Sequence, residues 1–427
     1  IHVEWFDQAF VPLLGAFVIL VFGMRARRWW SSDSISLAAS SLFAVWLVPF
    51  LHLTFTVPHN STYVLLLAVV FLFPVINRWP FAWIGGWIVC FALLIHPLLG
   101  VPIVALFSSA LIARRWPRLS APVAFILVVG GILSAFFFYV QRVQGMVLSI
   151  DIVHVKAAFH ILFGFPFVSS SAPWWMILAY RMLHVWPLVF IFLGYFGLRN
   201  LKPEERWIRR TILGTAFGMM TAAFILAGWI RLPNIMSNEQ YEFALRLRYA
   251  IPVLFIPGVM RILARFSFLH GIKKGIFIIP LVVLALGMWY GSYPQQNRLV
   301  KMHAPGLGRS DMEMVRLIER TADGKPYVAL TPQMVSAAAL RIIGFERELQ
   351  TVAGPRYPYA IPTGGELYGW YLQVWRMLEY RPVLQHVFAF SQTEHVFLVL
   401  PKAWDPNGIL DRALSAYASD RRAVSDR

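Results

Sequence analysis

Long apolar runs in this chain are separated by polar breaks whose charge alternates along the sequence. Four breaks are strongly basic, and the breaks between them are poor in Lys and Arg over the first part of the chain. The basic residues are Arg25, Arg27 and Arg28; Arg114, Arg115 and Arg118; Arg199, Lys202, Arg206, Arg209 and Arg210; and Arg261, Arg265, Lys273 and Lys274. Because short basic loops stay in the cytoplasm, this alternation predicts a polytopic membrane protein and also its orientation.

The composition agrees with a membrane protein. Only 14% of the 427 residues are charged, whereas a soluble domain carries about 25%. The net charge of +17 would also suit a nucleic-acid-binding protein. The basic residues gather between apolar runs, however, so membrane topology explains the charge better, and no nucleic-acid partner is expected. We expect an integral protein of the cell (inner or plasma) membrane that contacts the lipid bilayer. The sequence does not identify a protein partner.

The number of membrane spans follows from the apolar runs, since a spanning helix needs about 20 mainly apolar residues. His96-Pro97 divides the long run at 81–113 into two spans joined by a tight external turn. The sequence therefore predicts an α-helical polytopic membrane domain at 1–291 with about ten spans. The runs lie at 9–24, 35–57, 62–77, 81–99, 101–113, 120–140, 176–198, 211–230, 249–265 and 275–291.

The external segment at 141–175 is too long for a simple turn. Asp151, His154 and His160 interrupt its apolar first half. Their spacing predicts one polar stripe on an amphipathic helix that lies in the membrane interface.

From residue 292 onward the composition changes to that of a soluble domain. Helices are predicted at 311–322, 333–343, 364–380 and 407–418, with strands at 327–331 and 395–400. Helices that alternate with short apolar strands are typical of an α/β domain. The alternation of basic loops places this small C-terminal domain, 292–427, on the extracytoplasmic side.

The densest cluster of charges on the predicted external side comes just before the span at 249–265. Glu239, Glu242, Arg246 and Arg248 stand there at helical spacing. Glu242 and Arg246 are four residues apart and can form a structural ion pair across one helical turn. Alternatively, the guanidinium groups form a site for a phosphate or pyrophosphate at the membrane surface, with Arg231 joining from the preceding span.

Two carboxylates, Glu4 and Asp7, lie three residues apart before the first span. They are candidates for a general base or for ligands of a divalent metal, the one cofactor the sequence suggests. More often, carboxylates at this place are solvated charges at a helix start. His59 and His96 lie on the same predicted side, as site residues or as structural hydrogen-bonding groups. The chain begins at Ile1 in what reads as the end of an external segment, so we expect it to be N-terminally incomplete.

A short motif resembles a known family. Arg248-Tyr249-Ala250-Ile251-Pro252, followed by Pro257, resembles the entry to a late span in membrane glycosyltransferases of the GT-C class. These include relatives of the aminoarabinose transferase and the protein mannosyltransferases. The resemblance implies many spans, an outward cavity for a sugar carried on a polyprenyl phosphate, and a soluble C-terminal domain on the outer face. The tail, around 332–345 and 362–372, looks like that of bacterial membrane proteins of this general kind.

The same resemblance implies roles for individual residues. Arg248, next to Tyr249, would hold the lipid phosphate. In this family an acidic residue of the first external loop activates the acceptor, often with a metal. Glu4 and Asp7 lie where the end of that loop would be, and the family's principal acid usually lies earlier than Ile1.

The leading hypothesis is therefore a membrane transferase that moves a sugar from a polyprenyl-phosphate donor to an acceptor at the outer face. Glu4 and Asp7 are the candidate catalytic residues. The candidate substrate-binding residues are Arg231, Glu239, Glu242, Arg246, Arg248, Tyr249, His59 and His96. Three alternatives stay open: a carrier or flippase for lipid-linked or small polar substrates, an O-antigen polymerase or ligase, and a structural or binding membrane protein.

Overall fold

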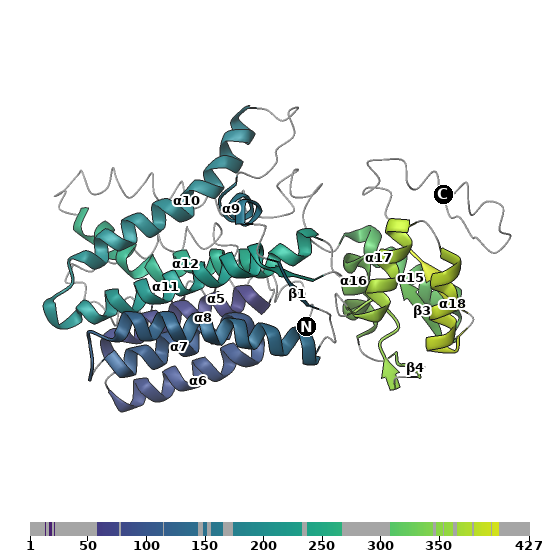
Figure 1. Ribbon diagram of the computed structural model, residues 1–427, viewed down its shortest axis with the longest axis horizontal. Coiled ribbons are helices and arrows are strands. Elements are labelled where there is room, and N and C mark those ends of the chain that lie inside the picture. Colours follow the sequence, from purple (N-terminus) through teal and green to yellow (C-terminus); the bar gives the residue numbers. More distant parts are fainter. Residues whose placement is uncertain are drawn as a thin grey trace. The chain divides into compact units, whose positions relative to one another are not determined.

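The structure of this protein is a computed structural model. It describes residues 58–76, 78–113, 115–143, 148–151, 155–164, 174–232, 237–266, 308–344, 347–352, 354–361, 365–377, 380–393 and 395–400, with Leu13, Phe17, Val18 and Val21. Most of this part is helical. The chain divides into two compact units, the second of which contains all residues from His303 onward. The boundary predicted between 291 and 292 lies outside the described residues. Each unit is described by itself (Figure 1).

The first unit is built from long helices. They are α5 (Pro58–Leu72), α6 (Trp79–Ile95), α7 (Pro97–Ala113), α8 (Ser120–Phe138), α9 (Val155–Phe163), α10 (Trp174–Arg199), α11 (Arg206–Gly228) and α12 (Ser237–Phe266). Short helical segments are η2 (Phe73–Val75) and η5 (Pro203–Glu205), while η3 (Tyr139–Val143), which follows α8, is grouped with the second unit. The two-residue strands β1 (Ser149–Ile150) and β2 (Ile230–Arg231) pair with each other.

The predicted break in the run at 81–113 is present. His96 has an extended backbone, with φ −153° and ψ 94°, and it ends α6 at Ile95. The residue before a proline avoids the helical region, and Pro97 then suits the first turn of the next helix. The two halves, α6 and α7, pack against each other, and Figure 1 shows them side by side with α8 and α11.

Small residues bring α8 and α11 into close contact. One stripe of α8 is buried at a spacing of four residues: Ser120, Ala124, Val128, Ile132 and Phe136. On the α11 side, a Cβ added at Gly214 would overlap the carbonyl oxygen of Ala121. Tight backbone approach through small residues is how helices associate in membranes, where lipid tails remove the usual hydrophobic driving force.

Within the described residues, three helices, and not the predicted ten or so, are long and apolar enough to cross a membrane. They are Ser120–Gln141, Pro203–Gly228 and Tyr241–Ile262. The apolar helices in the runs predicted at 62–77, 81–99 and 101–113 are shorter: α6 and α7 have 17 residues each, about 25 Å of helix against a hydrocarbon core of about 30 Å. The runs at 35–57 and 275–291, and all but four residues of 9–24, lie outside the described residues. The predicted count of about ten is therefore not reached in the part of the chain that the structure describes.

The helix predicted around Asp151, His154 and His160 differs in the structure. Helix α9 begins only at Val155, so Asp151 is not on it. Instead, the Asp151 amide donates a hydrogen bond to the Trp229 carbonyl at 2.7 Å, next to the β1–β2 pair. The single stripe is thus wrong, because this short strand pair takes up the start of the segment. His154 lies outside the described residues.

The second unit is a small layered α/β fold. Its elements are α15 (Arg309–Ala322), β3 (Tyr327–Leu330), α16 (Gln333–Ile343), β4 (Leu349–Thr351), β5 (Gly354–Arg356), α17 (Glu366–Met377), α18 (Tyr380–Ser391) and β6 (His395–Leu398). Strand β3 pairs in parallel with β6. On its other side, the Ala329 amide donates to the Pro358 carbonyl at 2.8 Å.

Alternate side chains of β3 enter two separate cores. Val328 and Leu330 pack in a cluster with α17 and α18, and Tyr327 and Ala329 in a cluster with α15 and α16. Successive side chains of a strand point to opposite faces. A strand covered on both faces reads as a continuous apolar run, which explains the sequence of 327–330.

The elements predicted for this unit are largely present, with two omissions. The helices predicted at 311–322 and 333–343 and both strands occur within a few residues of their predicted bounds. The helix predicted at 364–380 ends at Met377, and α18 and the antiparallel β4–β5 hairpin were not predicted. The helix predicted at 407–418 lies outside the described residues.

Candidate functional site

The N-terminal part of α12 carries most of the candidate site. This helix has 30 residues and contains Pro252 and Pro257. Proline has no N–H group, so the carbonyl of Arg248, four residues before Pro252, receives no helical hydrogen bond. Arg248 is also the point in the sequence of α12 where a polar first part gives way to a mainly apolar second part.

Arg248 is a buried cation. It is 7% exposed, and its Nη1 atom has no hydrogen-bond partner in the part of the chain that the structure describes. Its Cζ atom lies 5.6 Å from the ring centroid of the neighbouring Tyr249. Burying an unpaired charge is expensive, so this guanidinium group suits an anionic ligand.

Arg246 lies two residues before Arg248 on the same helix, and its side chain is only loosely paired with Glu242. Its Nε atom is 3.9 Å from Glu242 Oε2, which is too long for a hydrogen bond. The predicted ion pair therefore exists as an electrostatic contact, and Nε makes no hydrogen bond to the described residues. From α5, the Tyr63 hydroxyl donates to the Arg246 carbonyl at 2.8 Å and holds the two helices together there.

His96 approaches this cluster from the break between α6 and α7. It is close enough to Arg246 for the guanidinium charge to act on its ring. Its Nδ1 atom accepts a long hydrogen bond of 3.4 Å from the Leu99 amide, so the imidazole also caps the start of α7. The structure thus brings together two predicted site residues that are 150 positions apart in sequence.

Arg231 lies at the edge of the cluster. Its Nη1 atom donates to the Tyr241 hydroxyl at 3.1 Å, one residue before Glu242. Three arginine side chains and one carboxylate side chain of the predicted set are therefore described here. We call Arg231, Arg246 and Arg248, with Tyr63 and His96, the arginine site. Its three guanidinium groups carry positive charge, which an anionic group such as phosphate would balance.

Other predicted site residues lie outside what the structure describes. Glu4 and Asp7 are among them, and so are the side chains of Glu239 and His59, although the backbone of these two belongs to α12 and α5. The described residues contain no group of three or more His, Cys, Asp or Glu that could hold a metal.

Two residues of the site were not predicted. The Tyr63 hydroxyl donates to the carbonyl of Arg246, and the Tyr241 hydroxyl accepts from the guanidinium group of Arg231. The available signal was a phenol within or next to an apolar run, because buried tyrosine hydroxyls usually find a hydrogen-bond partner.

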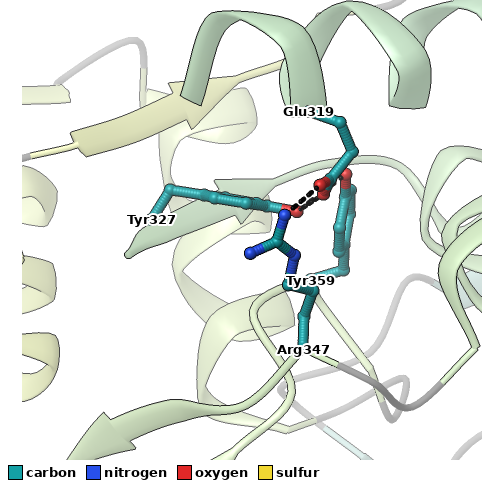
Figure 2. A network of polar contacts seen from close by, with 4 residues as sticks. All are labelled: Glu319, Tyr327, Arg347 and Tyr359. Atoms are coloured by element: carbon teal, nitrogen blue, oxygen red, sulfur yellow. Dashed lines mark hydrogen bonds and ion pairs between the residues drawn. The ribbon is translucent and has the colours of Figure 1, made fainter. Parts of the chain in front are cut away.

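A second polar cluster lies in the C-terminal unit (Figure 2). The Tyr327 hydroxyl donates to Glu319 Oε1, and its oxygen is 3.3 Å from the Tyr359 hydroxyl. Arg347 pairs with the other carboxylate oxygen of Glu319 at 3.1 Å. Figure 2 shows the side chains of Tyr327, Arg347 and Tyr359 converging from separate parts of the chain around the Glu319 carboxylate. Because each has its partner, this cluster is structural.

Burial keeps the phenols of this cluster protonated. It raises the pKa of Tyr359 to about 12. The pKa of Tyr327 is raised as well, first by burial and then by its hydrogen bond to Glu319. Neither phenol therefore supplies a base at neutral pH.

No protein-family model, curated protein or solved structure matches this chain. The arrangement of the chain's own residues must therefore carry any functional conclusion.

Proposed function

We propose that this protein is a polytopic membrane glycosyltransferase of the GT-C class. It moves a sugar from a polyprenyl-phosphate donor to an acceptor, in the inner or plasma membrane of the cell. The arginine site and the C-terminal unit face the extracytoplasmic side, as the alternation of basic loops indicates. The observation that supports the proposal most is the buried guanidinium of Arg248, which has no described partner.

The chemistry asked of this site is mainly electrostatic. An acceptor hydroxyl oxygen attacks the anomeric carbon of the sugar, and the bond from that carbon to the phosphate oxygen breaks. The polyprenyl phosphate leaves with the bonding electrons, and a carboxylate takes the hydroxyl proton. Arg246 and Arg248 stabilise the leaving phosphate, since donors in a water-poor site are most effective where charge develops. Glu4 and Asp7 are the proposed carboxylates.

The phosphate contact is tested by comparing a polyprenyl monophosphate with the neutral polyprenol of the same length. We expect the purified full chain to bind the phosphate more tightly. Arg248→Gln should weaken phosphate binding by about 30-fold or more, because a buried charge pair loses one partner. Polyprenol binding should not change. The measurement is a titration in detergent micelles, followed by transfer of sugar from a polyprenyl-phosphate sugar.

The matched control is Arg261→Gln on the same helix. Arg261 is also buried, but its Nη2 atom donates to the Asn200 carbonyl at 2.8 Å, about 20 Å along α12 from Arg248. If both variants weaken binding of the polyprenyl phosphate equally, Arg248 is a structural residue. Unchanged transfer by Arg248→Gln would remove this site assignment.

The break between α6 and α7 favours a second candidate, a carrier for lipid-linked substrates. Discontinuous helices beside a charged site are typical of transporters, and His96 lies at such a break next to Arg246. A carrier would bind the lipid phosphate through the same arginines but would transfer no sugar. Binding that depends on Arg248, together with movement of the lipid across vesicles and no product, would select this candidate.

A further inference from the structure

Two loops of the first unit and the far part of helix α12 meet at the end of the bundle away from the arginine site. Arg210 Nη1 donates to the Pro117 carbonyl at 3.4 Å, which joins the start of α11 to the α7–α8 turn. Arg209 Nη1 donates to the Arg199 carbonyl at 3.2 Å. Arg261 reaches the next carbonyl, that of Asn200. These bonds place one end of each of the three candidate spans at a common level.

Besides the buried Arg261, this basic end carries seven cations whose side chains are described. They are Arg115, Arg118, Arg199, Lys202, Arg206, Arg209 and Arg210, against two carboxylates, Glu204 and Glu205. All but Arg209 are exposed, and Arg209 is partly exposed. None of the seven forms an ion pair with a carboxylate within the described ranges.

The hydrogen bonds of Arg209 and Arg210 concentrate this charge without neutralising it. Each guanidinium carries five N–H groups, and the described bonds use one of them on a neutral carbonyl. Aromatic rings flank the same level: Trp116 is 53% exposed and lies 5.5 Å below the Arg115 guanidinium. Tryptophan prefers the depth of the lipid headgroups.

We propose that the basic end is a binding site for the phosphate headgroups of anionic phospholipids. Its charge is opposite to theirs, and it lies where three apolar helices end, which is the depth of a headgroup in a bilayer. The hydrogen bond from Arg210 to the Pro117 carbonyl joins α11 to the α7–α8 turn, and exposed cations lie on both of these segments. This site differs from the arginine site and does not depend on the proposed transferase activity.

The test is lipid selectivity of the full chain in a bilayer. The protein is reconstituted in phosphatidylcholine vesicles, and the association of spin-labelled phosphatidylglycerol is compared with that of spin-labelled phosphatidylcholine. We expect a preference for phosphatidylglycerol that decreases as salt is added. Each removed cation should lower the relative association constant by up to about fivefold. Lys202→Gln removes an exposed cation whose side chain makes no described hydrogen bond, and the double variant Arg209→Gln, Arg210→Gln removes the two that bond to loop carbonyls.

Lys156→Gln is the matched control, because Lys156 is an exposed cation on α9. We expect it to leave the preference unchanged. Equal association of the two lipids with the unmodified protein would overturn the proposal. So would a loss in Lys156→Gln as large as that in Lys202→Gln, since net charge alone would then explain the effect. Inorganic phosphate at matched ionic strength should not displace the labelled lipid, and full displacement would assign the site to free phosphate instead.

Discussion

Arg248 and Tyr327 are both buried polar residues, but their surroundings differ. The Tyr327 hydroxyl contacts Glu319 and Tyr359, while Arg248 Nη1 has no described partner. A buried polar group costs free energy unless it is hydrogen-bonded. The tyrosine cluster therefore stabilises the C-terminal unit, and the arginine is better explained as a group that binds a ligand.

The raised phenol pKa values predict how stability depends on pH. Above about pH 10 the unfolded chain loses phenol protons, whereas Tyr359 keeps its proton until about pH 12. The unfolded state then binds fewer protons, so the free energy of unfolding of the C-terminal unit falls as the pH rises through this window. At and below neutral pH the phenols contribute no pH dependence.

The titration itself can be followed by tyrosinate absorbance of the folded chain. We expect Tyr359→Phe to remove one phenol from the group that ionises late, with the early group unchanged. Loss of a phenol that ionises near pH 10 would contradict the burial of Tyr359. The same titration in urea supplies the reference, because all phenols should then ionise near pH 10.

At the scale of elements, glycine residues set how closely helices α10 and α12 pack. A Cβ added at Gly197 of α10 would overlap the carbonyl oxygen of Gly258 of α12, and a Cβ at Gly258 would overlap that of Gly194. The two backbones are thus in direct contact. This crossing holds the apolar part of α12 in place, beyond the prolines that follow the arginine site.

We expect Gly197→Ala to destabilise the protein by about 1–3 kcal/mol, the usual cost of overpacking. Gly130→Ala on α8 is the control, because its added Cβ meets nothing within 4 Å. Alanine favours a helix over glycine by up to about 1 kcal/mol, so the control should be neutral or slightly stabilising. Thermal unfolding in detergent micelles measures both, and shifts of the same sign would refute the close α10–α12 crossing.

The sequence predicted elements well where local signals were strong. Proline at 97 located the break between α6 and α7, and a continuous apolar run located β3. Helix α18 was missed although Val383, Val387 and Phe390 are buried at helical spacing. The hydrogen bond of Tyr63 to Arg246 and the approach of His96 to the charge of Arg246 could not be predicted, because they depend on how helices distant in sequence pack.

At the scale of the whole molecule, the helices of the first unit expose large apolar side chains along their length. Helix α6 exposes Trp83, Trp87 and Phe91 at successive turns. The chain's single cysteine, Cys90, is exposed among them. A surface of this kind is suited to lipid and not to water.

Cys90 therefore reports whether this surface faces the bilayer. In intact membranes we expect it to resist a charged, membrane-impermeant maleimide, because a charged reagent does not enter the hydrocarbon layer. After denaturation in sodium dodecyl sulfate the thiol should react fully. Rapid labelling in native membranes would show that the outer face of α6 contacts water.

The position of β3 has a consequence for the life of the chain before it is folded. Its four apolar residues favour a strand, and a strand with unpaired edges can pair with another chain. In the folded unit β3 has β6 on one side and the Pro358 carbonyl on the other. Both edges of β3 are thus paired once those later residues have been synthesised. A chain that stops before them would leave the strand edges unpaired and able to bind other chains.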